Sequence, residues 1–270
     1  MNVQKSSKLA PDDVSAPVLR IAETITAPRL PALFVADLHL AEGRPRTTAA
    51  FFDFLSGPAQ QAGSVFILGD LFEYWVGDDD VGSPFNQSVC NALSATVDAG
   101  ISIHYMTGNR DLLAGEGFAR ASGVRPLADM ASLRFEGRTI LLSHGDALCT
   151  DDHDYQAFRL QARNREWQAG FLAQPIEVRR SIIENMRNQS EAAKREKRME
   201  IMDVNAEAVV DLLRSHGYPT LIHGHTHRPT RHTYLIDGHR CERYVLPDWH
   251  DHAVWLAFDG DEFSARSALT

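Results

Sequence analysis

The sequence predicts an α/β fold built from short buried strands and flanking helices. Five apolar runs lead directly into polar residues, and they read ALFVADLH, SVFILGD, SIHYMTGNRD, TILLSHGD and TLIHGHTH. Continuous apolar runs of this kind are typical of strands that are buried on both faces. Helical patterns at residues 47–55 and 86–99 indicate helices layered on the sheet. Because ligand groups in such folds gather beyond the carboxyl ends of the strands, the five polar ends predict one functional site.

The chain divides into three expected regions. Residues 1–29 are rich in Ser, Pro, Ala and Asp without periodicity, and we expect a flexible tail there. Residues 30–150 and 203–270 carry the strand pattern and form the expected core. Residues 151–202 have a helical pattern with no strand signal, which predicts a helical insertion.

Composition excludes several classes of protein. With 44% apolar residues in 270, the chain can bury a sizeable core, so bulk disorder is excluded. The net charge of −9 argues against a nucleic-acid partner. Three separated cysteines predict neither disulfides nor a zinc–thiolate site, which fits a reducing cytosol. Neither a signal sequence nor an apolar run of the roughly 20 residues needed to span a bilayer is expected.

The polar strand ends carry the residue types that bind divalent metal ions. Hard divalent cations prefer carboxylate, amide oxygen and imidazole ligands, and no thiolate is among the groups present. In Asp37-Leu38-His39 and in His225-Thr226-His227, we expect alternate side chains of an extended segment to face one cavity. A single DxH motif is weak evidence, because it often occurs by chance. Five such motifs in order, each after an apolar strand, favour a metal centre strongly.

This order of motifs resembles the calcineurin-like metallophosphoesterase superfamily, whose pattern is DxH, GD, GN(H/R)(D/E), (G/S)H and GHxH. The resemblance extends over about residues 32–258. It implies a two-sheet β-sandwich flanked by helices, with the insertion as a lid over the active site. It also implies two divalent cations, bridged by Asp70. The first would be bound by Asp37, His39, Asp70 and His227, and the second by Asp70, Asn109, His144 and His225.

Arg110 is the informative departure from the wider superfamily, in which many members have histidine at this position. Arginine keeps its proton at accessible pH, so it can stabilise phosphate charge but cannot protonate an alkoxide leaving group. A pyrophosphate bond, whose leaving group is itself a phosphate, is therefore the favoured substrate. The alternative is that Arg110 only pairs with Asp111.

Longer strings give a narrower resemblance. DLFEYWVGDD, GNRDLL, LSHGDALCTDD, EIMDVN, HGHTHRP and VLPDWH resemble the UDP-2,3-diacylglucosamine pyrophosphohydrolases of lipid A biosynthesis. This resemblance implies Mn²⁺-dependent attack of water on the α-phosphorus, giving UMP and 2,3-diacylglucosamine 1-phosphate. Fe²⁺ and Zn²⁺ remain open, because the same ligands can bind them. The substrate contacts implied are Asn109, Arg110, Asp152, Ser190, Lys194, Lys197 and His225, although the family often has asparagine at position 194.

The predicted insertion suits a lipid substrate. Its apolar residues can line an acyl channel, since burying each CH₂ contributes about 0.8 kcal/mol, or they can be ordinary packing. The candidates for the channel wall are Phe158, Trp167, Phe171, Ile176 and Ile183. Basic residues over 179–198 alternate with Glu, which is typical of a solvated helix face. Some of them can instead meet the diphosphate or anionic lipid, which predicts a monomer attached peripherally to the inner membrane of a Gram-negative bacterium.

Three alternatives remain open at this point. The chain can be another dinuclear phosphoesterase, which leaves Arg110 and the insertion without a role. It can be a non-catalytic scaffold of the same fold, which predicts missing ligands, or a lipid-transfer module, which leaves the metal ligands unexplained. We also expect carboxylates that orient the ligands to be found among Asp111, Asp146, Asp152 and Asp248.

Overall fold

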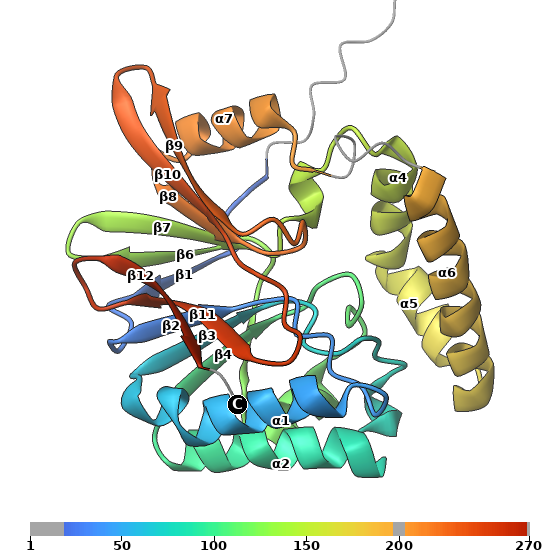
Figure 1. Cartoon of the computed structure of the whole chain (residues 1–270). Coiled ribbons are helices and arrows are strands. Elements are labelled where there is room, and N and C mark those ends of the chain that lie inside the picture. Colours follow the sequence, from blue (N-terminus) through green and yellow to red (C-terminus); the bar gives the residue numbers. More distant parts are fainter. Residues whose placement is uncertain (1–18, 197–202, 269–270) are drawn as a thin grey trace, which may run out of the picture.

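Two sheets packed face to face form the centre of the fold, with helices on both outer sides (Figure 1). This computed structural model describes residues 19–196 and 203–268, without the side chains of residues 188–196. Helices α1 and α2 cover one sheet and α7 covers the other, while α4, α5 and α6 stand beside both sheets. The predicted two-sheet sandwich flanked by helices is thereby confirmed.

The sheet covered by α1 and α2 contains most of the predicted buried strands. Its order is β12 (Phe263–Ala268), β11 (Ala253–Phe258), β2 (Ala32–Val35), β3 (Ser64–Leu68), β4 (Ser102–Met106) and β5 (Arg125–Leu127). Strands β2 to β5 run parallel, so their carboxyl ends lie at the same edge. Every residue of β2 and β3 is buried, as the continuous apolar runs predict.

The second sheet supplies the remaining two strand ends of the predicted site. Its order is β1 (Glu23–Thr26), β6 (Ala131–Phe135), β7 (Arg138–Ser143), β8 (Thr220–His223), β10 (His239–Val245) and β9 (Thr230–Ile236). Strands β7, β8 and β10 are parallel. Phe34, Phe66, Leu142 and Phe258 are among the residues that fill the space between the two sheets.

The helices follow from local sequence signals. α1 (Pro45–Ser56) and α2 (Pro84–Asp98) both begin with proline, whose missing N–H costs nothing in the first turn. They confirm the predicted helices and extend each by two residues at its start. The other helices are α3 (Glu116–Ser122), α4 (His153–Ala162), α5 (Arg165–Leu172), α6 (Ile176–Glu196) and α7 (Ala206–Ser215), with 3₁₀ turns at Pro58–Gln61, Asp78–Asp80 and Asp146–Leu148.

Helices α4 to α6 occupy the segment in which helices are predicted. The side chains of Asp152 and Asn164 cap the first turns of α4 and α5. Arg179 of α6 is 1% exposed and forms an ion pair with Asp79, which joins the start of this helix to the loop after β3. That residues 151–202 form a separate insertion stays a prediction.

The predicted tail, residues 1–29, includes a strand, and its residues 1–18 lie outside the described structure. Glu23–Thr26 form β1, which pairs in parallel with β6 at the edge of its sheet. Three of its four residues are exposed, so the apolar signal of a buried strand is missing. The sequence also did not predict strands β5, β6, β9 and β12 or helices α3 and α7. In the part of the chain that the structure describes, no helix is long and apolar enough to span a membrane.

Trp249 links the helical layer to the strand that carries the first predicted ligand. Its side chain is fully buried and makes edge contacts with Phe51 and Phe54 of α1, at centroid distances of 6.2 and 5.5 Å. Its backbone N–H donates to the carbonyl of Asp37 over 3.0 Å.

We expect Trp249→Ala to lower the free energy of unfolding by about 3–5 kcal/mol, because the cavity left between α1 and the sheet cannot close. Urea unfolding measures this loss. Leu235→Ala, at a side chain that is 80% exposed, is the control and should stay within about 0.5 kcal/mol of wild type. Equal stability of the two variants would contradict the packing role of Trp249.

Candidate metal centre and adjoining cavity

The five polar strand ends converge at one edge of the sandwich. Asp37 and His39 follow β2, Asp70 follows β3 and Asn109 follows β4. From the second sheet, His144 follows β7, and His225 and His227 follow β8. The site therefore lies across the ends of both sheets, and the convergence predicted from the sequence is present.

The ligand pairs are not extended, which corrects the prediction. Asp37, His39 and Asp70 have φ angles of 55°, 51° and 53°, and His225 and His227 have 70° and 53°. All five values lie in the left-handed region, where side chains other than glycine are strained. Tight turns, rather than the alternation of an extended segment, therefore direct these side chains inward.

Glycines beside the ligands allow the loops to approach each other. A Cβ atom on Gly108 would lie 2.1 Å from Oδ1 of Asp70, and one on Gly224 would lie 2.3 Å from Oδ2 of Asp37. Such contacts are impossible, so both motifs need glycine immediately before the ligand.

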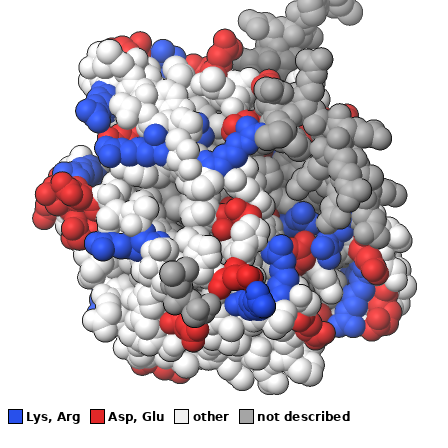
Figure 2. All heavy atoms as spheres, in the orientation of Figure 1, with Lys and Arg blue, Asp and Glu red and all other residues white. Residues whose placement is uncertain are grey.

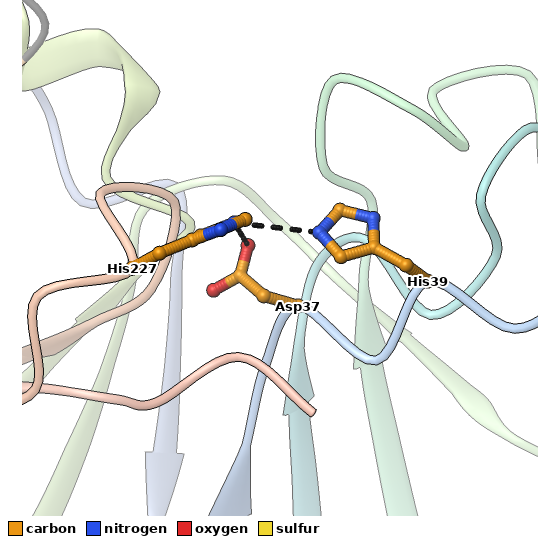
Figure 3. A group of neighbouring side chains, drawn as sticks. All are labelled: Asp37, His39 and His227. Carbon is orange, nitrogen blue, oxygen red and sulfur yellow. Dashed lines mark hydrogen bonds and ion pairs between the residues drawn. The ribbon is translucent and has the colours of Figure 1, made fainter. Parts of the chain in front are cut away.

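The first group of side chains comprises Asp37, His39 and His227 (Figure 3). Asp37 and His227 point toward each other, with Oδ1 and Nε2 separated by 3.4 Å, and His39 faces them from the loop after β2. The Nε2 atoms of His39 and His227 are 3.3 Å apart. Three donor atoms thus surround one point.

The second group lies around the amide oxygen of Asn109. Nε2 of His144 and Nδ1 of His225 are 3.1 and 3.0 Å from this oxygen. Oδ1 of Asp70 lies 3.8 Å from Nε2 of His144. Asp37 also comes within ligand range of Asp70 and His144, so the two groups adjoin.

The chemistry of these atoms fits divalent cations. Nδ1 of His144 lies 2.9 Å from the carbonyl of Leu68, so Nδ1–H donates there and Nε2 presents a lone pair toward Asn109. Lone pairs that face each other need a proton or a cation between them. Oδ1 of Asp37 is buried without a hydrogen bond, which leaves an atom able to bind a metal ion.

The pKa values show the same electrostatic demand. Burial raises the pKa of Asp70 to about 7. Burial opposes protonation of His144, but Asp70, Asp146 and Asp37 together raise its pKa to about 9. Burial lowers the pKa of His39 to about 2 and that of His225 to about 3, so both imidazoles are neutral and able to donate a lone pair.

Nearby carboxylates hold the loops and one imidazole. Asp111 accepts hydrogen bonds from the N–H groups of Leu71 and Gly108 over 2.7 and 2.8 Å, and so ties the loops after β3 and β4 together. Asp248 lies 3.5 Å from Nδ1 of His227, an arrangement that can orient this ring.

A cavity of about 630 Å³ extends from these groups toward α4, α5 and α6. Asn109, Arg110, Asp152 and His225, all predicted substrate contacts, line it. The apolar part of its wall is formed by Trp75, Leu112, Leu113, Phe158, Trp167, Phe171, Ile183 and Met186. Four of the five predicted wall residues are among these, while Ile176 is not.

Three predicted substrate contacts cannot be placed. Ser190 and Lys194 belong to the part of α6 whose side chains are outside the described structure, and Lys197 lies outside the described residues. These assignments stay predictions.

Two charged residues of the cavity were missed as candidate site residues. Glu73 pairs with Arg110 over 3.4 Å and with Arg187 over 2.8 Å, and all three line the cavity. The sequence gives no sign of this meeting, because Arg187 is one of many charged residues on α6. Arg110 does not pair with Asp111, whose carboxylate accepts backbone N–H groups instead.

Comparison with known proteins identifies the family. Residues 30–229 match the calcineurin-like phosphoesterase family. A UDP-2,3-diacylglucosamine hydrolase of Aromatoleum aromaticum is 55% identical over 85% of this chain and 93% of its own. Proteins of the same name from Klebsiella pneumoniae and Cellvibrio japonicus are 47% and 46% identical, over 85% and 83% of this chain and 95% and 92% of theirs. This chain is therefore a hydrolase that belongs to the calcineurin-like phosphoesterases and, within them, to the UDP-2,3-diacylglucosamine hydrolase family.

Proposed function

We propose that this protein hydrolyses the pyrophosphate bond of UDP-2,3-diacylglucosamine in lipid A biosynthesis, giving UMP and 2,3-diacylglucosamine 1-phosphate. The observation that carries the proposal is that seven candidate metal ligands lie together beside a large, mostly apolar cavity. The metal-ligand set suits phosphoester chemistry, and the apolar cavity suits acyl chains. The names of the relatives support the same substrate.

The donor atoms suit two cations, for which Mn²⁺ is our choice. Asp37, His39 and His227 would hold one, Asn109, His144 and His225 the other, and Asp70 would bridge them. Bound there, two divalent cations supply Lewis acidity, which lowers the pKa of the attacking water and neutralises phosphoryl charge. Water would attack the α-phosphorus and break its bond to the bridging oxygen, which would leave with the sugar 1-phosphate and give UMP.

Arg110 stabilises the charge that develops on the phosphates. Its backbone N–H donates to Oδ1 of Asp70 over 2.8 Å, which fixes the residue beside the metal-binding groups. Its guanidinium stays protonated, so it cannot deliver a proton to the leaving group. A phosphate leaving group needs none, and this is why the arginine favours a pyrophosphate bond over an alkyl ester.

The apolar wall of the cavity binds the acyl chains. Phe158, Trp167 and Phe171 lie on α4 and α5, and the rings of Trp167 and Phe171 stack at 5.3 Å. Each CH₂ group that leaves water contributes about 0.8 kcal/mol, so even part of a long chain gives substantial affinity.

We further propose that the monomer works at the inner membrane of a Gram-negative bacterium, bound peripherally where its lipid substrate resides. Leu160, Leu172 and Val178, on α4, α5 and α6, are exposed apolar side chains that can meet a lipid surface. On the face drawn in Figure 2, basic and acidic side chains of the described residues are intermixed, which does not favour a nucleic-acid partner.

Product analysis tests the proposed reaction. Purified protein with Mn²⁺ and UDP-2,3-diacylglucosamine in mixed micelles should release UMP, and a chelator should stop this release. Asn109→Ala should lower kcat by about 100-fold or more, because a metal ligand that faces the phosphate is lost.

The outcome separates the proposal from its rivals. Chelator-sensitive hydrolysis of bis(p-nitrophenyl) phosphate without UMP release would indicate another dinuclear phosphoesterase. Folded, metal-loaded protein that hydrolyses neither compound would contradict catalysis and favour the scaffold.

A second test addresses the acyl site. Trp167→Ala should raise KM for the diacyl substrate by roughly tenfold, which corresponds to about 1.4 kcal/mol of lost apolar contact. Leu160→Ala is the matched control, because this side chain lies on α4, is 70% exposed and does not line the cavity. Steady-state kinetics in micelles measures both, and the same KM in both variants would contradict the acyl site.

A further inference from the structure

Glu73, at the cavity wall, lies among three arginine side chains and the imidazole of His39. Its Oε1 atom is 2.8 Å from Nη2 of Arg187 and 3.4 Å from Nη1 of Arg110. Its Oε2 atom is 3.6 Å from Nδ1 of His39 and 3.9 Å from Nη1 of Arg44. The carboxylate therefore joins α6 to both the metal-binding loop and Arg110.

Backbone hydrogen bonds fix where this carboxylate stands. The N–H of Glu73 donates to the carbonyl of Leu40 over 3.0 Å, in the loop that carries His39. Two residues later, the N–H of Trp75 donates to the carbonyl of Arg110 over 3.2 Å. The Glu73 side chain is only 12% exposed, so the loops after β2, β3 and β4 hold it with little freedom.

Arg187 is the contribution of α6 to this cluster. Its guanidinium lies 5.7 Å from the centroid of the Tyr74 ring, and both side chains line the cavity. The side chain of Arg187 is 30% exposed and lines the cavity, so an anion there can reach it.

Two guanidiniums that share one oxygen repel each other, and the repulsion grows where water is excluded. Glu73 compensates this repulsion, so Arg110 and Arg187 can stay together at the wall. Two positive charges opposite one carboxylate leave an excess of positive charge that faces the cavity. A diphosphate, with several anionic oxygens, is complementary to such a pair of planar donors.

We propose that Glu73 is a positioning residue, which holds Arg110 and Arg187 together as one receptor for the phosphates of the substrate. Of the two arginines, α6 supplies Arg187, and the loop after β4 supplies Arg110. The inference rests on the proposed pyrophosphate substrate, and it assigns roles to two residues that the sequence did not single out for the reaction.

The rival explanation is that Glu73 only fastens α6 to the core. The structure offers a matched control for this, because Arg180 of α6 pairs with Asp80 over 2.6 Å and neither residue lines the cavity. Glu73→Gln removes an ion pair between α6 and the proposed phosphate receptor. Arg180→Gln removes an ion pair between α6 and the core that lies away from this receptor.

The experiment compares wild type, Glu73→Gln, Glu73→Asp, Arg187→Gln, Arg180→Gln and the double variant Glu73→Gln/Arg187→Gln. Each is loaded with Mn²⁺, its metal content and thermal midpoint are measured, and kcat and KM are determined with UDP-2,3-diacylglucosamine in micelles. Glu73→Gln should lower kcat/KM by about 10–100-fold with unchanged metal content, mainly through kcat. Glu73→Asp, which keeps the charge, should lie between wild type and Glu73→Gln.

The remaining variants distinguish a positioning role of Glu73 from a role only in attaching α6 to the core. Arg180→Gln should stay within about twofold of wild type. In the double variant, the loss should be smaller than the product of the single losses, because Glu73 acts partly through Arg187.

Equal effects of Glu73→Gln and Arg180→Gln, a loss explained by missing metal, or independent effects of Glu73 and Arg187 would overturn the inference and leave the proposed reaction intact. Wild-type protein that does not cleave the substrate would overturn both.

Discussion

Electron-pair donors packed together away from water are the constraint on which this structure depends. The carboxylates of Asp37 and Asp70 and the ring of His144 are buried within ligand range of one another. Such groups repel unless positive charge lies between them: burial raises the pKa of Asp70, and the carboxylates of Asp70, Asp146 and Asp37 raise the pKa of His144. The sandwich supplies the rigidity that keeps them together, since each loop leaves a strand that is mostly buried. The ligand residues keep strained φ angles because the surrounding rigid structure holds them there.

The sequence was a good guide wherever chemistry and burial coincide. The five strands that end in ligands are rich in buried apolar residues, so their positions, the two-sheet fold and the convergence of the loops could all be predicted. Edge strands such as Glu23–Thr26 could not, because an exposed strand that pairs on one side has no continuous apolar pattern. The left-handed φ angles at Asp37 and His227 could not be predicted, since Asp and His adopt such angles more often than most residues but still only in a small minority of cases.

The contacts between α6 and the core show a second limit of the sequence. Many charged residues follow one another on this helix, and the pattern alone is typical of a solvated face. The structure separates them: Arg179 and Arg180 pair with Asp79 and Asp80, away from the cavity, whereas Arg187 reaches Glu73 at its wall. Helices α4 to α6 thus bring both apolar side chains and the cation of Arg187 to the cavity.

The central claim is that the seven converging side chains hold two metal ions. Anomalous diffraction from crystals grown with Mn²⁺, recorded on both sides of the manganese edge, tests it directly. The account predicts two peaks about 3.5–4 Å apart. One should lie among Asp37, His39 and His227, the other among Asn109, His144 and His225, with Asp70 touching both. A single peak, or peaks outside these two groups in crystals saturated with Mn²⁺, would contradict it.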